Sequence, residues 1–183
     1  MILFLNGPFG VGKTTVARLL VERLSNAALY NPEIVGSVLM RVLGPIKKAD
    51  DFQDYPLWRT LVVEGARLSK KLRKRTLVVP MTVWRRDYFD QISGGLRRLD
   101  PDLRLFRLTA SEETLVGRIL SRPEAEGGHE WCLGHLGVCL EASRDSAFGT
   151  QVGTDGLSPS EVAGEILNLV GHQGPTAGMR RAG

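Results

Sequence analysis

Short apolar runs alternate along the chain with segments whose apolar residues recur at helical spacing. Such runs are typical of strands buried on both faces of a parallel sheet, and the intervening segments predict helices that cover those faces. The pattern therefore predicts an α/β fold with ligands bound at the carboxyl ends of the strands. The strands are expected at Ile2–Asn6, Ala27–Tyr30, Thr76–Met81, Leu103–Leu108 and Thr150–Gly153. The main helices are expected at Lys13–Leu24, Glu33–Leu43, Arg86–Leu99 and Glu130–Ser143, with others that begin near Pro56, Glu112 and Pro159.

Capping residues mark the start of two of these helices. Ser111 is expected to cap the helix that follows it, where two glutamates in the first turn suit the positive end of the helix dipole. Residues 158–161, Ser-Pro-Ser-Glu, predict a capping box with proline at the first helical position.

A glycine-rich segment between the first strand and the first helix carries the main functional signal. Residues 7–14, Gly-Pro-Phe-Gly-Val-Gly-Lys-Thr, fit the phosphate-binding loop pattern G-x-x-x-x-G-K-[ST]. Lys13 is expected to reach the β- and γ-phosphates of ATP, and the Thr14 hydroxyl to ligate Mg²⁺. An ordinary glycine turn is the alternative, but the flanking strand and helix favour nucleotide binding. The nucleotide contacts are expected from Gly7, Pro8, Phe9, Gly10, Val11, Gly12, Lys13, Thr14 and Thr15.

The chain has 183 residues and a formal net charge of +4. This length suits one domain, expected over residues 1–171, followed by a flexible tail at residues 172–183. No apolar run is long enough to cross a bilayer, and the first strand begins at Ile2. We therefore expect a cytoplasmic protein with no stable membrane insertion.

A dense basic tract occupies residues 70–75, Lys-Lys-Leu-Arg-Lys-Arg. One interpretation is a nucleic-acid patch, and the other is a cationic helix end that the helix dipole favours. No aromatic residues interleave with the charges for base stacking, so we expect no nucleic-acid partner.

Two cysteines and a histidine, Cys132, His135 and Cys139, share one face of the expected helix Glu130–Ser143. At 1.5 Å per residue the two cysteines would lie about 10 Å apart along the helix axis, which is too far for one tetrahedral metal ion. We therefore expect no metal site there and two buried thiols, as in a reducing compartment.

The rest of the chain narrows the class of nucleotide-binding protein. The strand Thr76–Met81 ends without the acidic residue of oligomeric ATPases and transporters, and the chain has no Asn-Lys-x-Asp guanine motif. What remains is the arrangement of the small kinases, with a helical insertion expected at about residues 32–74 and a short lid at about residues 122–130. Arg118 and Arg122 are expected to approach the phosphates from the helix before that lid, and Arg118 to stack on adenine. The alternative for both arginines is a solvated helix face.

Three segments resemble the tunicamycin resistance proteins, which are relatives of the nucleotide and small-molecule kinases. These segments are residues 6–14, residues 50–59 and residues 79–82. The second, Asp-Asp-Phe-Gln-Asp-Tyr-Pro-Leu-Trp-Arg, is the most specific because general kinase chemistry does not require it. The resemblance extends from residue 1 to about Leu169. It implies a three-layer P-loop kinase fold with a five-stranded parallel sheet in the order 2-3-1-4-5, ATP binding, and protection against a uridine-containing antibiotic.

The resemblance also implies an acceptor site for a nucleoside-like small molecule, in which aromatic rings stack on uracil and arginines bind a diphosphate. Asp51 or Asp54 is the expected general base, although both carboxylates are also suited to capping the next helix. Asn31 stands just after the second strand, where this family can carry Asp. For Trp58, core packing is an equally good interpretation. The remaining acceptor-side residues are expected to be Tyr55, Trp58, Arg59, Thr82, Trp84, Arg85 and Arg86.

Three functions remain open from the sequence. The first is a kinase that phosphorylates a hydroxyl of the antibiotic, and the second is an ATP-dependent binding module that sequesters it without chemistry. The third is a metabolic nucleoside or nucleotide kinase, which the absence of an Asp-Gly-Phe-Pro-Arg segment disfavours. The oligomeric state is left open.

Overall fold

Five parallel strands form one sheet in the order β2-β3-β1-β4-β5, as expected. The computed structural model describes residues 1–32, 34, 36, 51–73, 76–123 and 128–172. The predicted helix Glu33–Leu43 lies almost wholly outside the described residues, as do the centre of the predicted lid and residues 173–183 of the predicted tail. The strands are β1 (Ile2–Asn6), β2 (Ala27–Leu29), β3 (Thr76–Pro80), β4 (Leu103–Thr109) and β5 (Thr150–Gly153).

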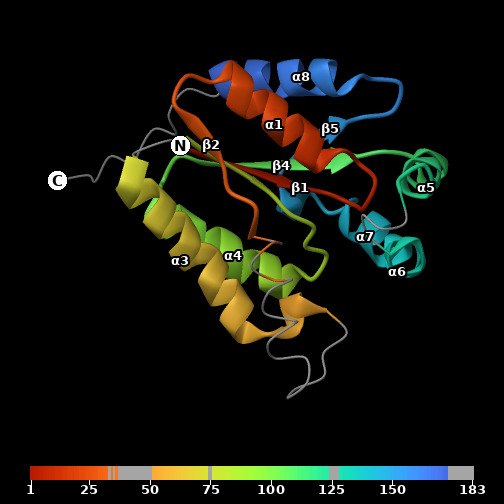
Figure 1. The fold of residues 1–183 in the computed structure, drawn as a ribbon, viewed down its shortest axis with the longest axis horizontal. Helices are drawn as coiled ribbons and strands as arrows, with labels where there is room; N and C mark the ends of the chain where they lie inside the picture. Colours follow the sequence, from red (N-terminus) through yellow and green to blue (C-terminus); the bar gives the residue numbers. More distant parts are fainter. Residues whose placement is uncertain (33, 35, 37–50, 74–75, 124–127, 173–183) are drawn as a thin grey trace.

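Helices cover both faces of the sheet (Figure 1). On one face lie α1 (Lys13–Arg23) and α8 (Pro159–His172), and on the other lie α3 (Pro56–Arg73) and α4 (Arg86–Leu99). The helices α5 (Glu112–Leu120), α6 (His129–Gly134) and α7 (Leu136–Ala142) gather beyond the carboxyl ends of the central strands (Figure 1). Two single-turn 3₁₀ helices, η1 (Phe52–Asp54) and η3 (Ser146–Phe148), precede α3 and β5.

The central strand β1 is apolar at nearly every position because both of its faces are buried. Ile2 and Phe4 pack into the core beneath α3 and α4, whereas Leu3 and Leu5 pack into the core beneath α1 and α8. Successive side chains of a strand point to opposite faces, so a strand covered on both sides needs apolar residues at every position. The sheet therefore separates two cores and presents its carboxyl edge to α5, α6 and α7.

The expected helix Glu130–Ser143 is wrong as a single element. It breaks at His135, which has φ −100° and ψ 0° and stands between α6 and α7. Glycines at positions 134 and 137 flank this residue, and glycine weakens a helix interior by about 1 kcal/mol relative to alanine. Both predicted caps are confirmed: Ser111 Oγ accepts from the Thr114 amide at 3.3 Å, and Ser158 and Glu161 exchange the two bonds of a capping box.

Both cysteines are free thiols and buried, as expected. Within the described ranges, no three His, Cys, Asp or Glu side chains come together as a metal site. None of the helices in those ranges combines the length and the apolar character needed to span a bilayer.

Two adjacent glycines in α4 test how tightly α3 packs on α4. A methyl group at Gly95 would lie 2.6 Å from Val63 Cγ2, whereas one at Gly94 would meet only the flexible end of Arg98, at 3.7 Å. We expect Gly94→Ala to stabilise the protein by about 0.5–1 kcal/mol through helix propensity. Gly95→Ala should be less stable than Gly94→Ala by about 1–3 kcal/mol because it overpacks the contact. Urea unfolding of both variants measures the difference, and equal stabilities would contradict this packing.

Candidate nucleotide and acceptor site

The glycine-rich loop lies between β1 and α1, against the backbone of two other elements. A Cβ at Gly7 would lie 2.6 Å from the Leu108 carbonyl oxygen of β4, and one at Gly10 would lie 2.9 Å from the Leu115 carbonyl oxygen of α5. Both glycines also have positive φ, of 151° and 82°. Side chains at these positions would collide with fixed backbone, so the loop conformation requires glycine.

Lys13 lies across this loop rather than out in solvent. Its side chain is buried, and Nζ donates to the carbonyl oxygens of Gly7 at 2.9 Å and Pro8 at 2.8 Å. The ammonium also lies 5.9 Å from the centroid of the Phe9 ring. A positive charge is thus held at the mouth of a loop whose amides precede a helix N-terminus, a combination that binds phosphate groups.

A buried pair of hydrogen bonds joins the loop to the segment after β3. Asn6 Nδ2 donates to the Val83 carbonyl oxygen, and the Val83 amide donates to Asn6 Oδ1, both at 2.9 Å. This pair fixes Thr82 and Trp84, the neighbours of Val83, beside the loop. The sequence analysis missed the role of Asn6, although its place just before the loop was visible.

Two hollows flank the loop. A pocket of about 110 Å³ contains Lys13, Thr14, Thr82 and Arg122, and another of about 310 Å³ extends from the loop to Arg118 and the residues after β5. These volumes are small for a complete nucleotide site, but both pockets border Gly10, Gly12 and Thr15 of the same loop. The first, with Lys13 and Thr14, has side chains that suit phosphate groups and a divalent metal.

Arg118 is held in place at the second pocket. Its guanidinium donates from Nη1 to Thr154 Oγ1 and from Nη2 to the Thr154 carbonyl oxygen, both at 2.9 Å. The next residue, Asp155, accepts from the Ser111 amide at 2.8 Å at the start of α5. Arg118 is therefore an anchored side chain that joins α5 to the end of β5. Arg122, which borders both pockets, is exposed.

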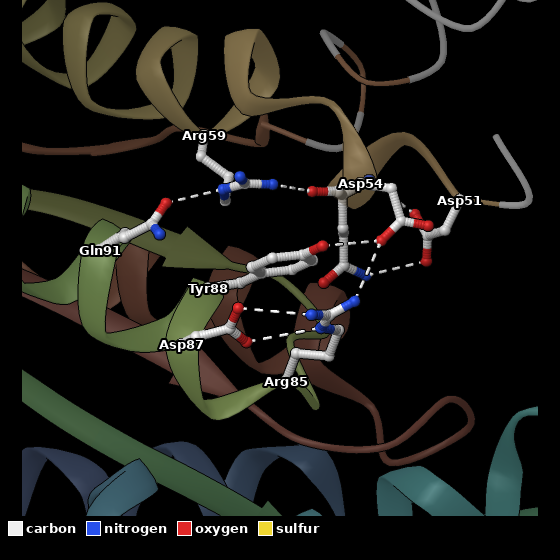
Figure 2. Close-up of polar contacts among 8 residues, drawn as sticks. Asp51, Asp54, Arg59, Arg85, Asp87, Tyr88 and Gln91 are labelled. Carbon is white, nitrogen blue, oxygen red and sulfur yellow. Dashed lines mark hydrogen bonds and ion pairs between the residues drawn. The ribbon is translucent and has the colours of Figure 1, made fainter. Parts of the chain in front are cut away.

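The acceptor side begins at η1, where Asp51 is buried with only 5% of its surface exposed. Its Oδ1 accepts from the Gln53 amide at 2.9 Å, and its Oδ2 from Gln53 Nε2 at 3.1 Å (Figure 2). Burial raises the pKa of Asp51 to about 6, and the nearby charge of Asp54 adds to this effect. The bonds from Gln53 and the charge of His135 act in the opposite direction.

Asp54 lies in a different environment, half exposed among charged partners. The Tyr88 hydroxyl donates to its Oδ1 at 2.9 Å, and Arg85 Nη1 lies 3.6 Å from the same oxygen. Figure 2 shows the Tyr88 ring between Arg59 above and Arg85 below, with guanidinium carbons 4.0 and 4.1 Å from the ring centroid. This stack ties the start of α3 to the start of α4. Tyr88 was not among the predicted site residues.

Other predicted acceptor residues are buried in the core or paired elsewhere. Trp58 is fully buried and donates its Nε1 to the Pro32 carbonyl oxygen at 3.2 Å, and Tyr55 is buried in the same core. For Trp58 this placement agrees with the packing interpretation.

Arg86 is exposed but pairs with Asp90 and Asp145, at 2.9 and 3.2 Å. The structure therefore brings Asp51, Asp54, Arg59 and Arg85 together and leaves these three aside.

Comparisons with known proteins agree with this geometry. A family model described as an AAA domain matches residues 2–131. The chain belongs to this family. Within it, the sheet order and the phosphate-binding loop described above make the chain a P-loop kinase-like protein.

Solved structures share the fold over nearly the whole chain. The tunicamycin resistance protein of Deinococcus radiodurans is 26% identical, covers 93% of this chain and 95% of its own, and has a TM-score of 0.74. A gluconokinase from Sinorhizobium meliloti is 19% identical over 93% of this chain and 91% of its own, with a TM-score of 0.64. The shikimate kinase of Acinetobacter baumannii, solved with shikimate, is 19% identical over 93% of both chains, with a TM-score of 0.63. No curated protein matched the sequence.

The resemblance to tunicamycin resistance proteins, read from the sequence, is thereby confirmed as a likeness of structure. The two metabolic kinases are too distant to show more than the common fold. All three share the P-loop kinase-like fold of this chain.

The buried Asp51 carboxylate makes a prediction about stability. Its folded-state pKa is raised from 3.8 to about 6, so its contribution to stability is fully present below about pH 4 and is lost as the pH rises through 6. Asp51→Asn removes this loss. The variant should therefore gain stability over the wild type between pH 4 and pH 7, by on the order of 2 kcal/mol.

Urea unfolding at pH 4.5 and pH 7.5 measures the change. Glu141→Gln, which removes an exposed carboxylate from α7, is the control and should follow the wild-type pH dependence. If Asp51→Asn and the wild type show the same pH dependence, Asp51 is not held in the folded protein as a poorly solvated acid.

Proposed function

We propose that this protein is an ATP-dependent kinase that transfers the γ-phosphate to a hydroxyl of tunicamycin or a similar uridine-containing compound. The observation that carries the proposal is a buried carboxylate, Asp51, on the acceptor side of a phosphate-binding loop. The charges of Asp51 and Lys13 both act on the Cys139 thiol, whose pKa burial raises to about 12. Both charged groups therefore lie near the same buried thiol, which supports a placement of the acid in the neighbourhood of the loop.

The loop amides and Lys13 would bind the triphosphate and withdraw charge from the transferring group. Thr14, exposed at the start of α1, would hold Mg²⁺ together with phosphate oxygens and water, which suits an ion that takes few ligands from protein. When bound there, Mg²⁺ supplies further neutralisation of the phosphate charge. Arg122 borders the same pocket and would add a second positive side chain.

Asp51 would act as the general base. The acceptor oxygen forms a bond to the γ-phosphorus, the bond from that phosphorus to the β-phosphate oxygen breaks, and the hydroxyl proton passes to Asp51. A carboxylate with a pKa of about 6 is a stronger base than an ordinary aspartate and is still ionised at neutral pH. Asp54, with its charge shared between Tyr88 and Arg85, is the weaker candidate.

A direct assay tests the function as a whole. The protein is incubated with ATP, Mg²⁺ and tunicamycin, and the drug is analysed by mass spectrometry for the gain of one phosphoryl group. A gain supports the kinase. Stoichiometric binding of the drug without a gain in mass would reject the kinase and support a protein that sequesters the drug. Phosphorylation of common nucleosides instead of the drug would indicate a metabolic kinase.

Lys13→Ala is expected to lower the rate of phosphoryl transfer by on the order of 10²–10³, as for other fixed charges that stabilise a transition state. Steady-state kinetics with tunicamycin as acceptor measure the loss. Lys71→Ala, which removes an exposed lysine from α3, is the matched control and should retain wild-type rates. A Lys13→Ala enzyme with unchanged kcat/KM would show that the loop does not serve transfer.

Asp51→Asn is expected to lower kcat by about 10²–10⁴, the range of a lost general base. Asp54→Asn, three residues nearer to α3, should lose much less. In the wild type, kcat should rise with pH until about pH 6 and then level off, because only ionised Asp51 accepts the proton. A larger loss in Asp54→Asn than in Asp51→Asn would reverse the assignment.

A further inference from the structure

Four aromatic rings from three separate segments meet beside the phosphate-binding loop. Phe9 lies in the loop, Trp84 after β3, Trp131 in α6, and His135 at the junction of α6 and α7. The Phe9 centroid is 5.2 Å from Trp131 and 6.2 Å from Trp84. The His135 centroid is 4.3 Å from Trp131 and 5.5 Å from Trp84. We call these four residues the aromatic group.

The aromatic group is open to solvent, unlike the core aromatics. Trp131 is 37% exposed, and the other three members are partly exposed, whereas Trp58 is fully buried. Large exposed rings contribute little to folding stability compared with buried ones, because much of their surface still contacts water. Exposed rings gathered beside a phosphate-binding loop are instead typical of ligand sites.

His135 gives the aromatic group one defined polar atom. Its Nδ1 lies 2.8 Å from the Trp131 carbonyl oxygen. A carbonyl oxygen only accepts, so Nδ1 carries a proton, and in the neutral ring Nε2 is left as a hydrogen-bond acceptor. The break between α6 and α7 sets this geometry, because it places His135 at the end of one helix with its ring directed back onto the preceding turn.

The aromatic group also lies close to both parts of the proposed chemistry. Phe9 is beside the Lys13 ammonium, at 5.9 Å from ring centroid to Nζ. Trp84 follows Val83, which is bonded to Asn6 at the start of the loop. His135 is near enough to Asp51 for its charge to act on that carboxylate. A molecule resting on these rings would therefore have the loop lysine on one side and Asp51 within the same region.

We propose that the aromatic group binds a planar heteroaromatic ring of the acceptor by stacking, with an N–H of that ring donating to His135 Nε2. A uracil-type pyrimidine meets both demands, since it has a flat face and an N3–H donor. Acceptors without such a ring, such as polyols and sugar acids, would lack both interactions. This inference rests on the proposed function and adds the residues that would hold the ring of the acceptor and select for it.

Stacking is tested with uridine as the probe, titrated by calorimetry into the protein in the presence of Mg²⁺ and a non-hydrolysable ATP analogue. Trp131→Ala should weaken uridine binding by about 5- to 150-fold, the range for loss of one base–aromatic stack. Trp131→Phe should bind within a few-fold of the wild type. Val138→Ala, an exposed site on α7, is the control and should bind uridine as the wild type does.

The hydrogen bond is tested with 3-methyluridine, which keeps the flat ring but lacks the N3–H. The wild type should prefer uridine by at least several-fold, and His135→Phe should remove that preference while it keeps the stacking. Circular dichroism and ATP-analogue binding confirm that each variant is folded. Absence of uridine binding to the wild type at millimolar concentration, or unchanged binding in Trp131→Ala, would overturn the proposal.

Failure of this inference is distinguishable from failure of the proposed function. Uridine binding that depends on Trp131, without phosphoryl transfer to any acceptor, would reject the kinase function but support uridine binding by the aromatic group. Phosphoryl transfer could instead proceed equally well to gluconate or shikimate and be unaffected by Trp131→Ala. That result would support the kinase function but reject the role of the aromatic group.

Discussion

The two hydrogen bonds between Asn6 and Val83 hold the nucleotide side and the acceptor side of the site together. Asn6 ends β1 just before the loop, and Val83 lies between Thr82 and Trp84 after β3. Both groups are buried, so separating them would leave unpaired donors and acceptors at a cost of about 1–3 kcal/mol each. The spacing between the two segments is therefore fixed before any ligand binds. Reactions that join two bound molecules depend on such fixed spacing, because small misplacements of the reacting atoms cost large factors in rate.

Asp51, the proposed general base, lowers the stability of the folded protein at neutral pH. An aspartate with a raised pKa makes the folded protein less stable at neutral pH than an uncharged side chain would. The chain retains this acid in a short 3₁₀ turn, where Gln53 supplies two hydrogen bonds but little solvent reaches the carboxylate. Nearby, Arg59 and Arg85 enclose Tyr88 and fix the start of α3 against α4. Interactions of this kind offset the penalty of Asp51 and keep its position defined.

Local patterns in the sequence were enough to predict most of the fold. The strand β1 has the expected bounds, because a parallel strand covered on both faces must be apolar at every position. The strand β5 also has the expected bounds, although only Val152 of its four residues is buried. The phosphate-binding loop was predictable because its glycines act through backbone geometry that the sequence fixes locally. The prediction of a single helix across His135 was wrong. The apolar periodicity continues through the break at this residue, which has glycines on both sides. Trp58 and Trp84 were both predicted acceptor residues, but Trp58 packs from α3 into the core with residues of β3 and α4, whereas Trp84 is partly exposed.

The fold by itself does not determine the acceptor. A gluconokinase and a shikimate kinase share it at 19% identity, and one fold commonly carries different substrate sites. In this chain the residues proposed to contact the acceptor come from three segments distant in sequence, at positions 51–59, 82–85 and 131–135. Only the first segment and Thr82 of the second belong to the motifs that carry the sequence resemblance. The third depends on the break between α6 and α7, which turns His135 and Trp131 toward Trp84. If these residues contact the acceptor as proposed, its selection can change through a helix interruption that is distant from the loop in sequence, while the phosphate-binding loop stays the same.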